Sequence, residues 1–412
     1  MITLNLNTTY LLRLMKQYLE SGGKDCSVPD FAPEADFKEI LRIAAHNNCD
    51  SFIYHTIWRW GAEYGVDASV MHAYKSRMLL SAASQLRADA ELKEVITDLC
   101  SAGVRYLLLK GVILSSLYPD PAYRRSIDAD IHVSDEYADL AAEVFIARGY
   151  EYIPNDHNKY VKTYRQNGIL SIELHTRLFE HFYEKNRAAI VSSELESHSS
   201  RREVKVLDTI VETLSPNHFL IYVICHHTKH FITSGINLRH LIDICVYVNK
   251  YHEQLNWEFI TGALERFCIK DFALYLLYIC KQYLGMVDIS FLFQDISEET
   301  VAMLIHDIIE RTANIDGAIA RASTYNIVRD IYYGKKKSIT NVMKSSIFPN
   351  TKALSTKYSY AKKHPILLPA AWIHRAFYYI WRKVKGHRMI SPAERTKLTK
   401  EKVELLKRVK IL

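Results

Sequence analysis

The stretch from Leu107 to Val133 constrains the fold more than any other part of the chain, because its pattern predicts strand, tight turn, short helix, loop and second strand. The second strand carries Asp128 and Asp130. Side chains two residues apart on a strand point to the same face, with Cα atoms about 6.6 Å apart. Two carboxylates in an apolar stretch are costly to bury unless a positive charge lies against them. The pair therefore predicts a binding site for divalent cations.

The residues around this pair predict a small mixed sheet. Ile127, Ala129 and Ile131 alternate with the two carboxylates, so we expect them to face the core. Asn167-Gly168, between two β-like runs, is typical of a hairpin turn. The expected elements are strands over 104–109, 126–133, 151–153, 159–165 and 169–175, with helices over 111–118 and 135–148.

Helical patterns flank this core on both sides. Apolar residues recur at intervals of three and four before residue 98, and Ser215-Pro216 supplies an N-cap and a first-turn proline for later helices. We therefore expect an α+β protein with a small mixed sheet between helical N-terminal and C-terminal regions. The predicted domains are a helical cap (1–98), the core (99–210), a helical domain (211–330) and a basic helical tail (331–412).

Charge is divided unevenly along the 412 residues. The net charge is +7, but residues 331–412 contain 20 Lys and Arg against three acidic residues, and the remainder contains 33 against 43. The tail therefore predicts a polyanionic partner, either an anionic membrane surface or nucleic acid. Trp372, Phe377 and Trp381 lie among its basic residues and suggest a helix that lies on a membrane. No apolar run reaches the roughly 18 residues needed to cross one.

The start of the chain and the cysteines bear on location. The first residues lack the charged start, apolar core and cleavage site of a signal peptide. The seven cysteines are odd in number and scattered, which indicates neither a disulfide framework nor a zinc knuckle. We expect a cytoplasmic protein, either free or peripheral at the inner face of the membrane.

Three motifs together resemble those of nucleotidyltransferases with a DNA polymerase β-like core. Lys110-Gly111 stands where that superfamily has a Gly-Ser turn, Asp128-Ala129-Asp130 fits its D-x-D pair, and Glu173 in the run IELH fits its third carboxylate. Within the superfamily, the chain is most similar to a family of uncharacterised bacterial nucleotidyltransferases that are often described near surface-polysaccharide genes. The resemblance covers roughly residues 100–250.

The resemblance implies transfer of NMP from an NTP to an acceptor whose identity stays open, with a link to surface-polysaccharide synthesis as one option. It implies Mg²⁺ as cofactor, with Mn²⁺ as a substitute, because carboxylate and phosphate oxygens suit both. Asp128, Asp130 and Glu173 would be the catalytic and metal-binding residues, with Glu173 also helping to deprotonate the acceptor. The residues assigned to nucleotide binding are Lys110, Gly111, Arg124, Arg125, His175, Lys229 and Arg239.

Several alternatives stay open. The missing Ser in the turn allows a catalytically inactive nucleotide-binding or scaffold protein of the same fold. A D-x-D pair also occurs in glycosyltransferases, but that fold would need a nucleotide-binding α/β region before residue 98, where helices are predicted. His226 and His230 are four apart on a helix and could ligate a metal. The polar residues of this helix, together with Arg239, could instead form contacts between domains.

Overall fold

The computed structural model divides the chain into two compact units. The first comprises Met1–Lys229 with Asn237–Ala313, and the second comprises His230–Ile236 with Asn314–Leu412. The described residues are 4–24, 34–58, 65–126, 128–154, 160–166, 168–178, 197, 200–313, 324, 327–328, 331–332, 348–351, 354, 356–385 and 392–412.

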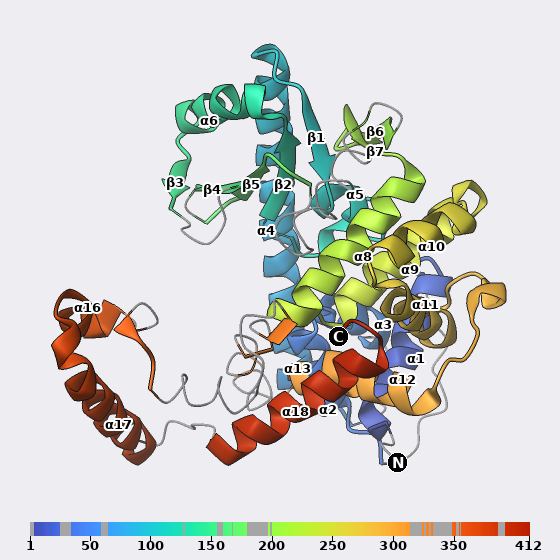
Figure 1. Ribbon diagram of the computed structural model, residues 1–412. Helices are drawn as coiled ribbons and strands as arrows, with labels where there is room; N and C mark the ends of the chain where they lie inside the picture. The colour runs from blue at the N-terminus through green and yellow to red at the C-terminus, as the bar shows by residue number, and fades with distance from the viewer. Residues whose placement is uncertain are drawn as a thin grey trace. The chain divides into compact units, whose positions relative to one another are not determined.

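A five-stranded mixed sheet forms the centre of the first unit, in the order β1-β2-β5-β4-β3. β2 runs parallel to β5 and antiparallel to β1, while β4 is antiparallel to both of its neighbours. β2 and β5 therefore lie side by side in the middle of the sheet (Figure 1). The strands are β1 (Tyr106–Leu109), β2 (Asp128–Val133), β3 (Glu151–Ile153), β4 (Val161–Arg165) and β5 (Ser171–His175).

The two faces of the central strands differ in chemistry. Ala129 and Ile131 of β2, with Ile172 and Leu174 of β5, are almost completely buried. Burial of a large aliphatic side chain contributes about 1.5–3 kcal/mol, so this apolar face is a major part of the core. Helix α6 (Ala138–Ala147) packs on this side, where its Phe145 contacts Tyr164 of β4. The opposite face carries the carboxylates.

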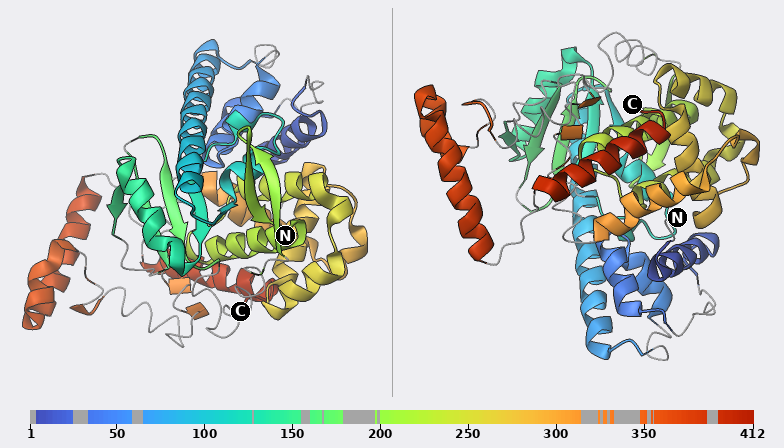
Figure 2. Two further views of the ribbon diagram at one scale, coloured as in Figure 1. Left: turned by 90° about the horizontal axis from the view of Figure 1, so that it is seen from above. Right: turned by 60° about the horizontal axis from the view of Figure 1, so that its bottom comes forward.

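A long helix, α4 (Ala68–Ser101), connects the sheet to the N-terminal helices (Figures 1 and 2). Its second half buries Leu92, Val95, Ile96 and Leu99. Both α4 and α2 begin at aspartate N-caps, which satisfy backbone N–H groups of the first turn. The other N-terminal helices are α1 (Leu6–Glu20), α2 (Phe37–His46) and α3 (Asp50–Ile57).

Short elements connect the strands of the sheet. They are α5 (Gly111–Ser115), the 3₁₀ turn η1 (Pro121–Tyr123) and the 3₁₀ turn η2 (Asp135–Tyr137).

A two-stranded hairpin and a set of helices follow the sheet. Thr213 of the hairpin donates a hydrogen bond from its Oγ1 to the backbone oxygen of Leu108, 2.7 Å away, so the hairpin lies against β1. These elements are β6 (Arg201–Val206), β7 (Thr209–Leu214), α8 (Pro216–Thr233), α9 (Leu238–Tyr251), η4 (His252–Gln254), α10 (Trp257–Arg266), α11 (Lys270–Leu284), η5 (Ser290–Leu292), α12 (Glu298–Ile305), the π-helical turn η6 (His306–Glu310) and α13 (Arg311–Ala313). The last turn of α8 belongs to the second unit.

The second unit contains helices with a small core of their own. Leu354, Tyr358, Ala361 and Ala371 are buried together, and Leu368 packs against them. None of the helices in the described part of the chain is long and apolar enough to cross a membrane. The elements are η8 (Thr356–Tyr358), α16 (Ser359–Lys363), η9 (Pro365–Leu367), α17 (Leu368–Val384) and α18 (Pro392–Arg408).

The structure confirms the predicted α+β class, with helices on both sides of a small mixed sheet. All five predicted strands form, and the predicted hairpin joins β4 to β5. The helix predicted over 111–118 is shorter and ends at Ser115. Ile127 and Asn167 lie outside the described residues. The division into four domains is finer than the two compact units, and it stays a prediction.

Candidate functional site

The predicted carboxylates lie on adjacent strands. In the parallel register of β2 and β5, Asp130 is directly opposite Glu173, and Asp128 is opposite Ser171. Neighbouring strands are about 4.8 Å apart, which brings these side chains within reach of one ion. One ligand atom each from Asp130, Glu173 and His175 lies within 4.8 Å of the others.

Lys110 supplies the positive charge next to this cluster. Its Nζ lies 2.8 Å from Oδ1 of Asp130 and 3.1 Å from Nε2 of His226 on α8. The backbone of Lys110 has φ = +32°, a conformation that costs a non-glycine residue about 1–3 kcal/mol. The turn thus places the ammonium group of Lys110 against the carboxylate of Asp130.

His175 contacts two of the carboxylates. Its Nε2 lies 3.2 Å from Oδ1 of Asp130 and 3.6 Å from Oε2 of Glu173. The imidazole is buried, whereas the Glu173 side chain is 39% exposed. A ligand from solvent can therefore reach Glu173 more easily than Asp130 or His175.

The carboxylates differ in their electrostatic environment. Burial alone would raise the pKa of Asp130, but the Lys110 ammonium and the His175 hydrogen bond outweigh it and hold that pKa well below its usual range. Asp128 is exposed at the start of β2, yet enclosure of its carboxyl group and the negative charges of Glu173 and Asp130 raise its pKa. Asp128 therefore lies in a field with excess negative charge, which a bound cation would relieve.

The donor set fits a divalent metal ion. Carboxylate oxygens are the ligands that Mg²⁺ and Mn²⁺ prefer, and an imidazole nitrogen is acceptable to Mn²⁺. Asp130, Glu173 and His175 are the only His, Cys, Asp or Glu residues that gather in this way in the part of the chain that the structure describes. Asp128 lies on the same strand as Asp130 but is not one of these three grouped residues.

Comparison with known proteins assigns the chain to a family. Residues 33–285 match the model of a family described as uncharacterised nucleotidyltransferase, which is more than half of the chain. The chain belongs to this family. One solved structure, an antigenic nucleotidyltransferase-like protein from Paracoccidioides brasiliensis, is similar with 16% sequence identity and a TM-score of 0.32, over 50% of this chain and 96% of that one. No curated protein matches the chain.

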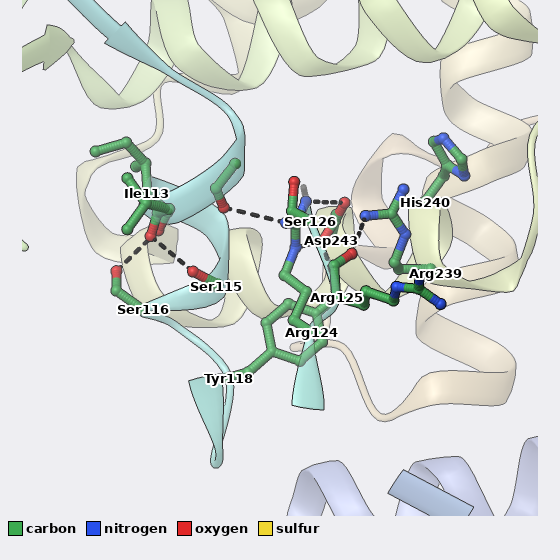
Figure 3. A network of polar contacts seen from close by, with 12 residues as sticks. Ile113, Ser115, Ser116, Tyr118, Arg124, Arg125, Ser126, Arg239, His240 and Asp243 are labelled. Carbon is green, nitrogen blue, oxygen red and sulfur yellow. Dashed lines mark hydrogen bonds and ion pairs between the residues drawn. The ribbon is translucent and has the colours of Figure 1, made fainter. Parts of the chain in front are cut away.

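In this nucleotidyltransferase-family chain, Arg124 occupies a different place from the one that the sequence suggested. Its Nε and Nη2 donate to Oδ1 and Oδ2 of Asp243 at 2.7 and 2.9 Å, and its Nη1 donates to the backbone oxygen of Gly111 at 3.1 Å (Figure 3). Tyr118 donates a further hydrogen bond to Asp243. Arg124 as a whole is only 3% exposed. These contacts engage the guanidinium, so a phosphate could bind Arg124 only by displacing Asp243. A nucleotide-binding role for Arg124 stays a prediction.

Arg239 lies next to this network. Its Nη1 donates to the backbone oxygen of Arg125 at 3.1 Å, as Figure 3 shows. Its Nε is buried without a hydrogen-bond partner among the described residues. Desolvation and the nearby Arg124 lower the pKa of Arg239. The charge of Arg239 partly offsets the rise in the pKa of Asp128 that burial and the other carboxylates cause. Arg239 is therefore a cation near the carboxylates whose hydrogen bonds are incompletely satisfied.

A polar pocket of about 370 Å³ lies between α3, α4 and η1. Arg125 lines it, and the Cα atom of Arg125 lies no more than about 11 Å from that of Asp128, because the two residues are three positions apart along the chain. The ion pair of Arg77 with Asp50, with an N–O distance of 2.6 Å, forms another part of the wall. The lining residues are Asn48, Asp50, Ser51, Ala73, Ser76, Arg77, Leu80, Ser81, Ser84, Tyr123 and Arg125.

The remaining predicted residues are placed as follows. Gly111 begins α5, and a Cβ at this position would lie 3.4 Å from the backbone oxygen of Asp128. Lys229 is half-buried one turn after His226 on α8. His226 contacts Lys110, and His230 contacts Ser234 through its Nδ1 at 2.7 Å. The two histidines predicted as possible ligands of one metal thus each have a different partner in the structure.

Sequence reasoning missed residues that position the site. Asp243 holds Arg124, His226 holds Lys110, and Gln85 of α4 accepts a hydrogen bond from the backbone of Ser126 at 2.7 Å. Asp243 did leave a signal, because it is a single acid in an apolar helical run and therefore needs a buried partner. The sequence indicated His226 only as a possible metal ligand, and Gln85 left no signal, because no local pattern shows their partners Lys110 and Ser126.

Proposed function

We propose that this chain is a Mg²⁺-dependent nucleotidyltransferase with a polymerase β-like core, which transfers NMP from an NTP to an acceptor. The observation that supports this most is the alignment of Asp130 with Glu173 across the parallel strands, next to Asp128. The raised pKa of Asp128 supports it further, because three clustered carboxylates with one ammonium group leave an excess of negative charge. A divalent ion would balance that charge.

The carboxylates would hold Mg²⁺. Asp130 and Glu173, assisted by Asp128, present oxygens toward one region, and His175 adds a nitrogen to the same group. When bound, divalent ions neutralise charge on the attacking and leaving oxygens of such a transfer. The same residues fix the geometry, because all of them lie on two hydrogen-bonded strands.

Glu173 is placed to assist the acceptor. Its side chain is the most exposed of the group that includes Asp130 and His175, so it can accept a proton from an acceptor hydroxyl. The acceptor oxygen would then attack the α-phosphorus of the NTP, the bond from that phosphorus to the bridging oxygen would break, and pyrophosphate would leave. One P–O bond forms and one breaks, and the proton of the acceptor hydroxyl passes to Glu173.

Cations near the carboxylates would bind the triphosphate. Lys110 reaches Asp130 from the turn, and its flexible ammonium can move to a phosphate oxygen. The buried Nε of Arg239 is a donor without a described partner, which a phosphate oxygen would satisfy. Gly111 would allow the turn to approach the nucleotide closely. Arg124 contributes indirectly, since it binds the backbone of Gly111.

The neighbouring polar pocket would receive the acceptor. Its serines, with Asn48 and the pair of Asp50 and Arg77, offer donors and acceptors that suit the hydroxyl groups of a sugar. Arg125 adds a positive charge for a phosphate or carboxylate on the acceptor. A sugar-bearing acceptor agrees with the surface-polysaccharide link that the resemblance implies, and it is the first class to test.

Transfer from α-labelled NTPs tests the proposal. The variant Asp128→Asn with Asp130→Asn should retain less than about one-thousandth of the transfer seen with Mg²⁺, because it removes two oxygen ligands and their charge. The control is Asp135→Asn with Asp139→Asn, which changes the same charge at side chains that are 66% and 96% exposed. Equal transfer by the two double variants would eliminate the proposed site.

A catalytically inactive nucleotide-binding protein is the second candidate. The observation that favours it is the contact of Lys110 with Asp130, which puts an ammonium group against a proposed metal ligand. Calorimetry with each NTP and Mg²⁺, followed by assays over a panel of sugar, protein and nucleic-acid acceptors, separates the two. Tight binding without labelled product from any acceptor supports the inactive protein.

A further inference from the structure

Helix α17 of the second unit exposes a continuous apolar stripe. Ile373, Phe377, Ile380, Trp381 and Val384 are 59%, 68%, 56%, 52% and 80% exposed. Their spacing of four, three, one and three residues puts them on one side of an α-helix. Large apolar side chains usually occur singly on a protein surface, and a contiguous set marks a binding surface.

The other side of α17 is already packed. Leu368 and Ala371 lie against the small core made with Tyr358 and Ala361 of the preceding segment. Trp372 donates a hydrogen bond from Nε1 to the backbone oxygen of Pro349 at 2.9 Å. Trp372 therefore lies on the packed side of the helix rather than on the lipid-facing surface that the sequence suggested. The exposed stripe is therefore separate from the small core of this unit.

The segment that carries the stripe is basic. The segment 356–385 contains seven Lys and Arg and no Asp or Glu. Lys357 lies over the ring of Tyr378 with its Nζ 3.1 Å from the centroid, and Nζ of Lys385 lies 6.0 Å from the ring of Trp381. Lys362 and Lys363 are exposed on α16. The segment thus combines exposed large apolar side chains with basic residues and no acidic ones.

This combination favours one kind of partner. Nucleic acid would pair with the charges but would offer little apolar surface to Ile373, Ile380 and Val384. A second copy of the chain could cover the stripe, but it would bring two sets of like charges together. An anionic membrane satisfies both features, because acyl chains accept the apolar side chains while lipid phosphates attract Lys and Arg.

We propose that the segment 356–385 docks on an anionic membrane surface. Phe377, Trp381 and their apolar neighbours enter the boundary between headgroups and acyl chains, and α17 lies in the plane of the membrane. The basic side chains lie at the level of the phosphates, as on the negatively charged cytoplasmic leaflet. This inference does not depend on the proposed transferase activity, because it uses no residue of the first unit.

Flotation of the full chain with lipid vesicles tests the proposal. Vesicles of phosphatidylcholine are compared with vesicles that also contain one-quarter phosphatidylglycerol. We expect at least tenfold more bound protein on the anionic vesicles, with binding weakened by 0.5 M NaCl because salt screens the charges. Equal binding to both vesicle types would overturn the electrostatic part of the proposal, and no binding would overturn all of it.

Substitutions separate the stripe from other apolar surface. Phe377→Glu with Trp381→Glu should reduce binding at least tenfold. The matched control, Leu79→Glu with Leu86→Glu, alters side chains of α4 that are 54% and 61% exposed and should bind like the parent. Equal loss in both variants, or none in the first, contradicts the proposal.

Charge and self-association are tested separately. Lys362→Gln with Lys363→Gln should weaken binding to the anionic vesicles while it keeps the stripe, so this loss cannot arise from disruption of the apolar face. Size-exclusion chromatography over a range of concentrations shows whether a second copy covers the stripe. A dimer that disappears in the Phe377→Glu, Trp381→Glu variant would assign the stripe to self-association and overturn membrane docking.

Discussion

Two buried ion pairs lie close together in this protein and have different roles. Arg124 and Asp243 have side chains that are 4% and 3% exposed, and both oxygens of Asp243 accept from the guanidinium. Lys110 and Asp130 are 12% and 6% exposed and meet through a single N–O contact of 2.8 Å. The first is a complete pair, because the planar guanidinium binds both carboxylate oxygens. The second is a point contact, because one ammonium nitrogen meets one oxygen.

The surroundings of the pairs differ as well. Asp243 accepts another hydrogen bond from Tyr118. Burial alone would raise the pKa of Asp243, but the charge and hydrogen bonds of Arg124 outweigh it and lower that pKa. Asp130 lies next to Asp128 and Glu173, so its region carries more negative charge than Lys110 can neutralise. A satisfied pair holds structure in place, and an unsatisfied one can bind a ligand. Burial and opposite charge alone do not distinguish the two.

The largest expected effect comes from breaking the complete pair. Asp243→Leu leaves the Arg124 guanidinium buried without its carboxylate, which should cost about 3–5 kcal/mol in the free energy of unfolding. Urea unfolding measures this cost. Arg124→Met combined with Asp243→Leu should recover most of it, because no charge is then left buried. If the double variant is as unstable as the single one, the pair is not the source of the loss.

Breaking the point contact should change ligand affinity. Lys110→Met frees Asp130 from its ammonium partner, so we expect about tenfold tighter Mn²⁺ binding, or about 1.4 kcal/mol, and weaker NTP binding. Calorimetric titrations of Mn²⁺ and of NTP measure the two effects. Lys162→Met, at an exposed ion pair with Asp139, should change neither affinity. Weaker Mn²⁺ binding in Lys110→Met would contradict competition between the lysine and the metal.

A smaller effect, of the opposite sign to that of Asp243→Leu, is expected at Asp128. The pKa of Asp128 is higher in the folded protein than in the unfolded chain, so the ionised carboxylate lowers the free energy of unfolding at pH values above the folded-state pKa. This loss of stability disappears once the pH falls below the pKa of the unfolded chain, because the carboxyl group is then protonated in both states. Asp128→Asn should therefore increase the free energy of unfolding at pH 7, by less than about 1 kcal/mol because solvent screens the charges around this exposed residue. Urea unfolding at pH 7 and in mild acid checks this. A gain that persists unchanged in acid would exclude the charge as its cause.

The smallest effect on stability is expected at Gly111. Its added Cβ would lie 3.4 Å from the backbone oxygen of Asp128, which is an ordinary contact. Gly111→Ala should therefore stay within about 1 kcal/mol of the parent in urea unfolding, while NTP affinity falls because the turn can no longer approach the phosphates closely. Unchanged NTP affinity would remove Gly111 from the nucleotide site.

Local patterns predicted the fold well and the site in part. Alternation around Asp128 and Asp130 predicted β2, and the later carboxylate on β5 was predicted to lie beside it. These predictions depend on neighbours in sequence and on the fixed geometry of strands. Arg124 shows where this reasoning ends, because a loop arginine looks the same whether it binds solvent, phosphate or Asp243, 119 residues away.

The sequence by itself determined the α+β class, the five strands and the basic, aromatic tail, because strand alternation, helical periodicity and charge are properties of neighbouring residues. The tertiary structure decided which cations are engaged and which apolar face of α17 is exposed. Burial and hydrogen bonding depend on distant partners such as Asp243 and His226, and no local pattern encodes the distance between them. The chain thus specifies its donors and acceptors locally, and folding assigns each to its partner.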